Sequence, residues 1–233
     1  MKGILIRVGI DATAGGWNAP VDPETRKFVF LPIPEDEEKV RPALARHYNE
    51  TIPALSRFHV HLPERLLGRP MHLDPDFKHL TYGDIHPRNI PLWNLDPGDF
   101  LAFYAGMRSI RKEDKFLVYA LIGFFLVDAV VNSKKVPKER WPESAHTRRE
   151  PYQNDVFIRA RPGVSGLLKR CIPIGEYRDR SYRVKKEILT AWGGLQVKDG
   201  YIQRSGRTPE FKNPQKFLDW FIDYKIPLER KNF

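Results

Sequence analysis

The block of residues 73–131 constrains the fold of this chain more than any other segment. It contains two apolar runs, Phe100–Gly106 and Leu117–Val131, which are joined by the polar connector Arg108–Lys115. Apolar runs rich in β-branched and aromatic residues predict buried strands. Because the connector between them is short and polar, we expect the two strands to form an antiparallel hairpin.

Five prolines between residues 58 and 93 exclude a long helix or a central strand in that stretch. We therefore expect a long ordered loop over residues 58–93, and long loops inside compact domains are often functional. The loop holds a crowded set of polar side chains just before buried strands, which is typical of a site on a rigid frame. The candidate catalytic residues in this region are Asp74, Asp76, His79, Tyr82 and Asp84.

Two interpretations of this polar set stay open. A carboxylate and an imidazole that face each other can form a general acid–base pair. Alternatively, Asp74 before Pro75 and the segment Tyr82–Asp84 are ordinary turn formers. The choice between them depends on whether the side chains converge in the fold.

Asp11 is a further candidate catalytic residue, because it lies where the predicted strand Lys2–Ile10 meets a loop of small residues. Gly15 and Gly16 in that loop would allow a ligand to approach the backbone closely. The alternative is a tight turn in which Asp11 bonds to its own backbone. Trp17, just beyond, is a candidate for stacking on a nucleobase, with a packed core indole as the alternative.

The rest of the chain predicts short elements. Val156–Ala160 has the composition of a strand, and Ser165 is expected to cap a helical turn over Gly166–Arg170. Tyr182–Trp192 is expected to be a helix, ended by two glycines. Asn213 is expected to cap a C-terminal helix over residues 214–224, whose apolar face would join the core. That face comprises Phe217, Leu218, Phe221 and Ile222.

These elements together predict an α+β fold with a mixed, β-rich sheet that is curled or barrel-like and has flanking helices. At 233 residues the chain can bury a real core, and we expect a single domain over residues 1–233. Within it, residues 1–131 would form the strand-rich core and residues 132–233 a basic extension.

Charge is distributed unevenly along the chain, whose formal net charge is +10. Residues 1–100 carry 12 Lys and Arg against 14 Asp and Glu, whereas residues 101–233 carry 27 against 15. A basic half is the expected footprint of a phosphate-backbone partner, so we expect the chain to bind nucleic acid, either DNA or RNA. The alternative is a solvated surface rich in ion pairs.

The candidate nucleic-acid-binding residues lie mainly in this basic part. Arginine can bind phosphate with two parallel hydrogen bonds, and a helix beginning at Ser165 would add backbone donors. The aromatic candidates for nucleic-acid binding are Trp17 and Tyr104, whose rings would stack on nucleobases. The basic and polar candidates are His146, Arg148, Arg149, Arg159, Arg161, Ser165, Lys169 and Arg170.

Cys171 is the only cysteine, which excludes an intramolecular disulfide and a multi-cysteine zinc site, and we expect it to be a small buried residue. The N-terminus leads directly into a predicted strand, without a signal-peptide layout. The apolar run 116–131 is too short for a membrane helix and contains Asp128. We therefore expect a soluble, cytoplasmic protein with no membrane partner. The sequence points to no particular cofactor and leaves the oligomeric state open.

Metal binding has little support in the sequence. His59 and His61 would share one face of a strand and could bind a metal with His72 or Asp74, but no spacing demands it, so we expect no metal site. A metal-dependent nuclease would need the carboxylates of Asp76 and residues 113–114 to converge on one ion. The second group falls in the predicted hairpin turn, away from the first.

Several segments resemble the nucleotide modification associated domain family, third type. The likeness covers most of the chain and is strongest in residues 1–131. The motifs that carry it are Ile4–Asp11 with Gly15-Gly16, Pro32–Glu35, Leu73–Phe77, Thr81–Asp84, Gly98–Gly106 and Ile122–Val127. The motif positions map onto Asp11, Asp74, Asp76, Tyr82, Asp84, Asp99 and Tyr104.

The resemblance implies a role in the modification of nucleic-acid bases, with DNA expected ahead of RNA as the partner. It names no reaction, so whether the chain is an enzyme stays open. The Gly98–Gly106 and Ile122–Val127 segments are also similar, over a shorter stretch, to PUA-like and EVE modified-base-binding domains. That second resemblance implies a curled β-barrel with a pocket for one base, and fold likeness alone does not settle function.

The leading hypothesis is therefore a base-modification protein that binds DNA or RNA through residues 146–186. It would take one base into a pocket near Asp11, Tyr82 and Asp84, which requires the base to leave the stack. The alternatives are a non-catalytic reader of modified bases and, third, a metal-dependent nuclease. An enzyme predicts acid–base groups with shifted pKa values in the pocket, and a reader predicts aromatic walls.

Overall fold

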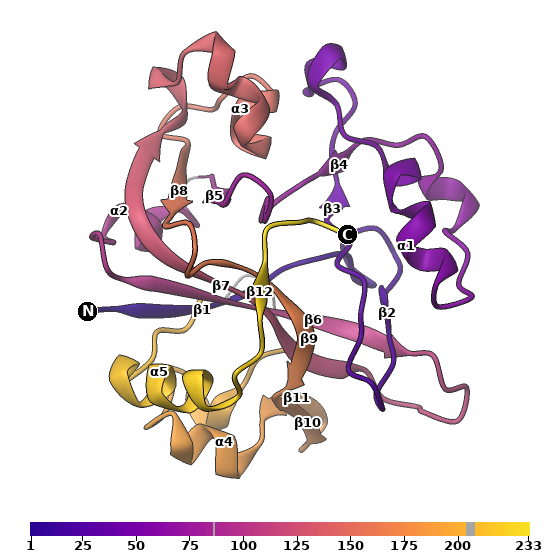
Figure 1. Ribbon diagram of the computed structural model, residues 1–233, viewed down its shortest axis with the longest axis vertical. Helices are drawn as coiled ribbons and strands as arrows, with labels where there is room; N and C mark the ends of the chain where they lie inside the picture. The colour runs from indigo at the N-terminus through magenta and orange to yellow at the C-terminus, as the bar shows by residue number, and fades with distance from the viewer. Residues whose placement is uncertain (86, 204–207) are drawn as a thin grey trace.

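The computed structural model describes residues 1–85, 87–203 and 208–233 (Figure 1). The strands are β1 (Gly3–Arg7), β2 (Pro20–Val21), β3 (Ile33–Pro34), β4 (Met71–His72), β5 (Thr81–Asp84), β6 (Phe100–Ser109), β7 (Val118–Asn132), β8 (Val156–Ala160), β9 (Gly166–Pro173), β10 (Gly175–Arg178), β11 (Ser181–Val184) and β12 (Leu228–Glu229). The α-helices are α1 (Ile52–Ser56), α2 (Ile90–Trp93), α3 (Ala145–Arg148), α4 (Lys186–Ala191) and α5 (Pro214–Asp223). This mixture of strands and helices confirms the predicted α+β class.

A central mixed sheet has the strand order β1-β6-β7-β8-β5, with β2, β9 and β12 paired off this path. The predicted hairpin is confirmed: β6 and β7 pair antiparallel from Phe100 opposite Leu126 to Met107 opposite Val118. β1 pairs parallel with β6. Nearly every residue of β6 is buried, because its two faces pack against different halves of the core.

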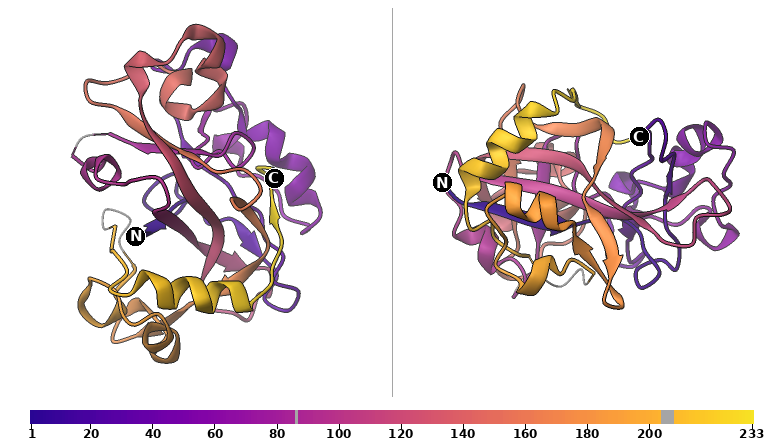
Figure 2. Two further views of the ribbon diagram at one scale, coloured as in Figure 1. Left: turned by 60° about the vertical axis from the view of Figure 1, so that its left-hand side comes forward. Right: turned by 90° about the horizontal axis from the view of Figure 1, so that it is seen from below.

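Strand β7 gives the sheet its curvature. Its first half pairs with β9, and its second half, from Val127 to Asn132, pairs with β8. The register shifts between Val127 and Ala129, and irregularities of this kind bend a strand and increase its twist. Figures 1 and 2 show β7 as a long curved strand that rises toward α3. The curled sheet is confirmed, but it is open rather than a closed barrel, because β1 and β5 do not pair with each other in the described residues.

Alternate residues of β6 contribute to two hydrophobic layers, since successive side chains point to opposite faces of a strand. Phe100 and Tyr104 join the layer covered by α4 and α5 (Figures 1 and 2). Leu101 and Phe103 join the opposite layer, which contains Phe77 at the centre of three edge-to-face aromatic contacts. The sheet therefore lies between two cores, and the sites discussed below lie on the second side.

The C-terminal helix is close to its prediction, and the Asn213 side chain accepts a hydrogen bond from the Lys216 N–H at 3.1 Å. Phe217 is fully buried, but Ile222 is 65% exposed, so the buried face is narrower than expected. The helix predicted over Tyr182–Trp192 is shorter, because its first residues form β11 and only Lys186–Ala191 is helical.

Two predictions about local structure are wrong. Ser165 does not cap a helix: its hydroxyl oxygen accepts a hydrogen bond from the Leu126 N–H at 3.0 Å, and Gly166 begins β9. The apolar side chains that follow are buried in a strand between β7 and β12, so tertiary packing outweighs the local helix signal. The expected loop 58–93 also contains β4 and β5, of which β5 belongs to the central sheet.

Within the described residues, no helix is both long enough and apolar enough to cross a membrane.

Candidate functional site

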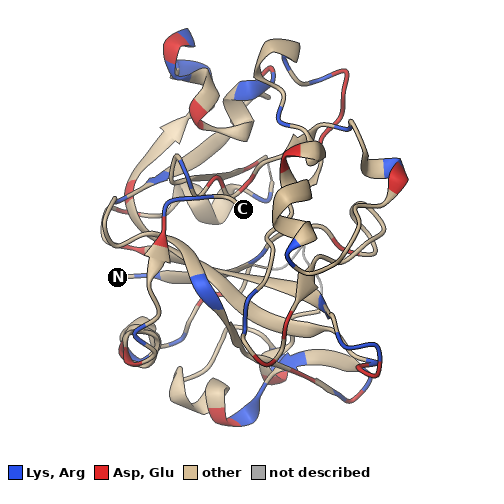
Figure 3. Cartoon of the chain, turned by 45° about the vertical axis from the view of Figure 1, so that its right-hand side comes forward, with Lys and Arg blue, Asp and Glu red and all other residues tan. Residues whose placement is uncertain are grey.

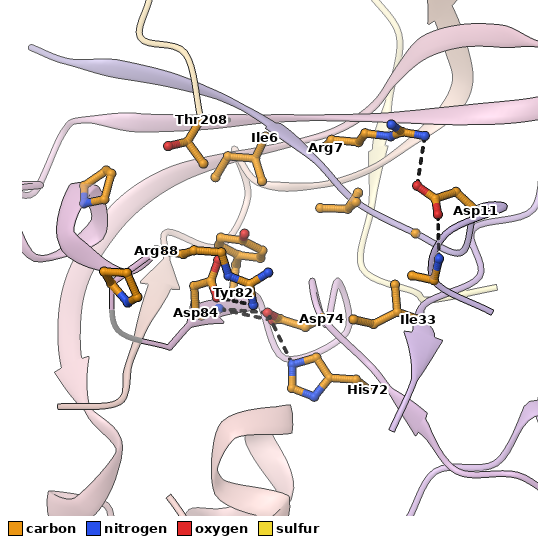
Figure 4. A pocket seen from close by; sticks show the side chains of 16 residues that line it. Ile6, Arg7, Asp11, Ile33, His72, Asp74, Tyr82, Asp84, Arg88 and Thr208 are labelled. Atoms are coloured by element: carbon orange, nitrogen blue, oxygen red, sulfur yellow. Dashed lines mark hydrogen bonds and ion pairs between the residues drawn. The ribbon is translucent and has the colours of Figure 1, made fainter. Parts of the chain in front are cut away.

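A pocket of about 440 Å³ lies between the two ends of the open sheet, with β1 on one side and β5 on the other (Figure 4). The curvature of β7 brings these two end strands to the same cavity, although they are far apart in the strand order. Its charged and aromatic lining residues are Arg7, Asp11, His72, Asp74, Tyr82, Asp84 and Arg88. Four of these, Asp11, Asp74, Tyr82 and Asp84, were candidate catalytic residues in the sequence.

Asp11 lies just after β1, where it forms the tight turn that was its alternative interpretation and also lines the pocket. Its Oδ1 accepts hydrogen bonds from the Thr13 and Ala14 N–H groups at 2.7 Å, as a tight turn requires. Its Oδ2 forms an ion pair with Arg7 Nη2 at 2.9 Å, and both side chains line the pocket. Asp11 and Arg7 therefore form an ion pair on the wall of the pocket that follows β1 (Figure 4).

Tyr82 and Asp84 extend from β5 into the opposite wall. The Tyr82 ring packs against Phe103 at a centroid distance of 5.1 Å, and burial raises the pKa of its phenol well above the usual value. Burial also raises the pKa of Asp84, although the ion pair with Arg88 at 3.0 Å opposes the rise. Asp84 is thus a carboxyl group that takes up a proton more readily than one in water.

Asp74 lies between β4 and β5 and also lines the pocket. Its carboxylate accepts the Gly83 N–H at 3.1–3.2 Å, which ties the loop to β5. His72 Nε2 lies 4.0 Å from Asp74 Oδ2, and His72 Nδ1 forms a hydrogen bond of 2.6 Å with Glu35. Burial alone would raise the pKa of Glu35, but the hydrogen bond with His72 and the charges of His72 and Arg149 outweigh it and lower that pKa to about 2.

His146, from α3, reaches the same carboxylate from behind the pocket. Its Nε2 lies 3.5 Å from Asp74 Oδ2, and its Nδ1 forms a hydrogen bond of 2.6 Å with Asp155. Burial lowers the pKa of an imidazole, but Asp155 and Asp74 outweigh this and raise the pKa of His146 to about 9. The His72 and His146 rings meet edge to face with centroids 5.1 Å apart. Two imidazoles therefore converge on the carboxylate of Asp74.

Asp76 and His79 lie outside this pocket, in a buried network. Asp76 has no exposed surface, and its Oδ2 accepts from His79 Nδ1 at 2.9 Å and from Arg148. Burial raises the pKa of Asp76, but the contacts with His79 and Arg148 outweigh it and hold the pKa well below its usual value. The pair of carboxylate and imidazole that the sequence suggested is formed by Asp76 and His79. The Asp76 carboxylate is bound by donors from the protein, and neither side chain is among the lining residues of the pocket.

Arg148 and Arg149, which were predicted to bind phosphate, are instead buried and form ion pairs within the protein. Arg148 pairs with Asp76 and also donates to the Pro142 carbonyl. Arg149 lies 3.8 Å from Glu35 and 3.7 Å from Asp155. It therefore balances the two carboxylates that are bonded to His72 and His146.

The remaining basic candidates lie on other parts of the surface. Arg159 is half-buried and pairs with Glu143 at 3.1 Å, and Arg161 is exposed near Asp128. Lys169 and Arg170 are exposed on β9, and Lys169 lines a second cavity that shares no described lining residue with the first. Lys and Arg are interspersed with Asp and Glu along the chain (Figure 3).

The two aromatic candidates are not at the pocket either. Tyr104 is fully buried, and its hydroxyl donates to the Ile202 carbonyl at 2.7 Å. Trp17 is partly buried against a separate hydrophobic cluster near α1. The position of Trp17 matches its alternative, a packed indole, and Tyr104 is likewise packed in the core.

His72, Arg7 and Arg88 line the pocket but were not among the candidate catalytic residues. The sequence gives a weak indication that His72 belongs to the site, because His72 lies two residues before Asp74 and is one of the histidines named as metal ligands. His59 and His61 are not part of the group: within the described residues, the set of His, Cys, Asp and Glu side chains close enough to share an ion is His72, Asp74 and His146. In the same described part of the chain, neither Asp76, which is fully buried, nor Glu113, which is exposed, belongs to such a group.

Comparisons with known proteins support one assignment. No curated protein and no solved structure matches the chain, and the local likeness to PUA-like domains is not shown by these comparisons. The profile of nucleotide modification associated domain 3 matches residues 2–210, which includes every described strand of the central sheet except β12 and all the residues that line the pocket. The chain therefore belongs to the nucleotide modification associated domain 3 family.

Proposed function

We propose that this protein is an enzyme that modifies one nucleobase or nucleotide held in the pocket between β1 and β5. The observation that carries this proposal is the chemistry of the walls: three carboxylates, one imidazole, two guanidinium groups and one phenol surround a single cavity. Membership of a family described as associated with nucleotide modification supports a nucleotide or nucleobase as the substrate. Clustered titratable groups with shifted pKa values are typical of active sites.

The dimensions and charges of the pocket suit such a substrate. Its volume of about 440 Å³ falls within the range of about 300–1,000 Å³ common for small-molecule sites. The guanidinium of Arg88, more than half exposed, is available for a phosphate oxygen. Asp84, whose pKa is raised by burial, is suited to accept or donate a proton at the substrate.

The walls favour an enzyme over a reader of modified bases. A reader would enclose the base between aromatic rings. Among the described lining residues Tyr82 is the one aromatic side chain, and the others on that wall are charged or small. Carboxylates and imidazoles in a pocket are chemically equipped for proton transfer.

For the macromolecular substrate we propose a polynucleotide, DNA ahead of RNA. The net charge of +10 supports attraction to a polyanion, and exposed cations such as Arg161, Lys169 and Arg170 could contact its backbone. A base in a duplex would have to leave the stack to enter the pocket. Binding of this kind would weaken as salt concentration rises.

The direct test is to incubate the protein with DNA, RNA and free nucleotides, with and without divalent metal ions, and to analyse the digested nucleosides by mass spectrometry. We expect a new or missing nucleoside with the wild-type protein and with Asp223→Asn, which changes an exposed carboxylate on α5. We expect the change to be at least tenfold slower with Asp84→Asn, because general acid–base groups contribute roughly 100- to 10,000-fold.

Other outcomes have defined meanings. Nucleic acid that is retained with unchanged nucleosides would replace the enzyme with a reader. Unchanged nucleosides without retention would refute the proposal. An affinity that is insensitive to salt would remove the polynucleotide and leave a free nucleotide as substrate.

A further inference from the structure

The group formed by His72, Asp74 and His146 has the composition of a metal site. One ligand atom from each side chain lies within 4.8 Å of the others. The Nε2 atoms of His72 and His146 lie 4.0 and 3.5 Å from Asp74 Oδ2. The three residues come from β4, the loop after it and α3, so the fold rather than a sequence motif assembles them. Two imidazoles and one carboxylate are a common ligand set for divalent first-row transition metals.

The outer partners of the two imidazoles favour the same interpretation. His72 Nδ1 is bonded to Glu35 and His146 Nδ1 to Asp155, each at 2.6 Å. A carboxylate on the far nitrogen orients an imidazole and makes the other nitrogen a better ligand, and this arrangement is nearly universal at histidine metal sites. Here both Nε2 atoms are turned toward Asp74 as a result.

A second observation is independent of the clustering. His146 Nε2 is buried, in a side chain that is 2% exposed, and has no hydrogen-bond partner among the described residues. Buried polar atoms in folded proteins are almost always satisfied. An ion between His146 Nε2 and Asp74 Oδ2 would satisfy this atom.

The local charge also calls for a cation. Asp74, Glu35 and Asp155 contribute three carboxylates, and Arg149 contributes one guanidinium between the last two. When both imidazoles are neutral, as metal ligation requires, the buried group has an excess of two negative charges. Uncompensated buried charge is costly, and a divalent cation would balance it.

We propose that His72, Asp74 and His146 bind one divalent transition-metal ion at the base of the β1–β5 pocket. Ligand atoms about 2.1 Å from a metal lie roughly 3.0–3.5 Å from one another, so the 3.5 and 4.0 Å pairs need only small side-chain shifts. His72 and Asp74 line the pocket, so the remaining coordination positions face it. The role of the ion in catalysis rests on the proposed function, whereas its binding does not.

An ion at this place would polarise a carbonyl or phosphoryl oxygen of the substrate or generate a nucleophilic hydroxide from bound water. The competing arrangement is a proton on His146 Nε2, which would make the group a structural ion pair. The two arrangements exclude each other at the same nitrogen, so metal uptake distinguishes them.

The test uses the full chain, stripped with a chelator and then titrated separately with Mn²⁺, Co²⁺, Zn²⁺ and, without oxygen, Fe²⁺. We expect one ion per chain by elemental analysis and calorimetry, and a visible absorption band on addition of Co²⁺. We expect His72→Ala to weaken binding by more than about tenfold, because even outer partners of metal ligands are worth about 10- to 100-fold. Glu35→Gln should weaken binding by an amount in that range.

His61→Ala is the matched control, because His61 is an exposed histidine outside the group, and its ion uptake should equal that of the wild type. Circular dichroism of every variant shows whether it is folded, and His72→Ala replaces a variant of the deeply buried His146. Absence of stoichiometric uptake, or equal uptake by wild type and His72→Ala, would overturn the proposal.

The outcome is separable from that of the proposed function. Stoichiometric uptake with unchanged nucleosides would retain the metal site and refute the enzyme. A nucleoside change that persists in the stripped protein would retain the enzyme and refute a catalytic metal.

Discussion

At the scale of single residues, a buried carboxylate stays ionised because hydrogen-bond donors surround it. Asp76 is fully buried, and its two oxygens accept from Lys78 N–H, His79 N–H, His79 Nδ1, Asn232 Nδ2 and Arg148. Removing one partner of such a buried pair leaves the other charge without compensation. Asp76 therefore acts in stability, although its residue type and position suggested catalysis.

We expect Asp76→Asn to lower the free energy of unfolding by about 3–5 kcal/mol, because Arg148 would remain buried without its counter-charge. Urea denaturation followed by tryptophan fluorescence measures this change. Asp223→Asn, on the exposed end of α5, should differ from wild type by less than about 0.5 kcal/mol. Equal stability of Asp76→Asn and wild type would contradict the structural role.

Cys171 should be chemically inert in the folded protein. Burial raises the pKa of its thiol to about 12, so at pH 8 the thiol stays protonated, and the thiolate is the reactive form. We expect iodoacetamide to leave native Cys171 unmodified at pH 8 and to alkylate it completely in urea, as measured by mass spectrometry. Rapid alkylation of the native protein would show that the side chain is accessible.

At the scale of elements, the packing of β5 against α3 and β8 depends on a residue without a side chain. A Cβ at Gly83 would lie 2.6 Å from His146 Cδ2 and 2.6 Å from the Val156 carbonyl oxygen. Gly83 also donates its N–H to Asp74. The close approach of strand and helix therefore holds two of the three proposed metal ligands in place.

Gly83→Ala should consequently destabilise the protein by about 1–3 kcal/mol, the usual cost of overpacking. The clash includes a backbone oxygen, which cannot rotate away. Thermal unfolding followed by circular dichroism gives the change, with Thr190→Ala on the exposed side of α4 as control. An unchanged melting temperature for Gly83→Ala would mean that β5 can move without cost.

At the scale of the whole molecule, the C-terminal segment joins parts that are distant in sequence. β12 pairs with β9, and beyond it the Asn232 side chain accepts the Phe77 N–H at 2.7 Å and donates to Asp76. Figure 1 shows this segment crossing the middle of the fold. We expect Asn232→Ala to cost about 1–3 kcal/mol, because it leaves the buried Phe77 N–H without a partner.

Chemical denaturation measures the free energy of unfolding of Asn232→Ala, with Lys231→Ala as the control. Among the described residues, Lys231 forms a surface ion pair with Glu229, so its removal should cost less than about 1 kcal/mol. If both variants lose the same stability, the segment does not act through Asn232.

The sequence predicted the parts of this fold that depend on local pattern. The β6–β7 hairpin follows from two apolar runs, and α5 follows from a cap and a proline. It could not predict which charges meet: Arg148 and Asp76 are 72 positions apart, and a basic residue looks the same in a sequence whether it is exposed or buried. His146 was chosen for its charge, and only the fold shows that it faces Asp74.

The pocket exists because the sheet is open and β7 is bent, and neither property belongs to the residues that line the cavity. The register shift at Val127–Ala129 lies between the part of the sheet that carries β1 and the part that carries β5. The width of the cavity therefore depends on the backbone of one strand as well as on the side chains that line it.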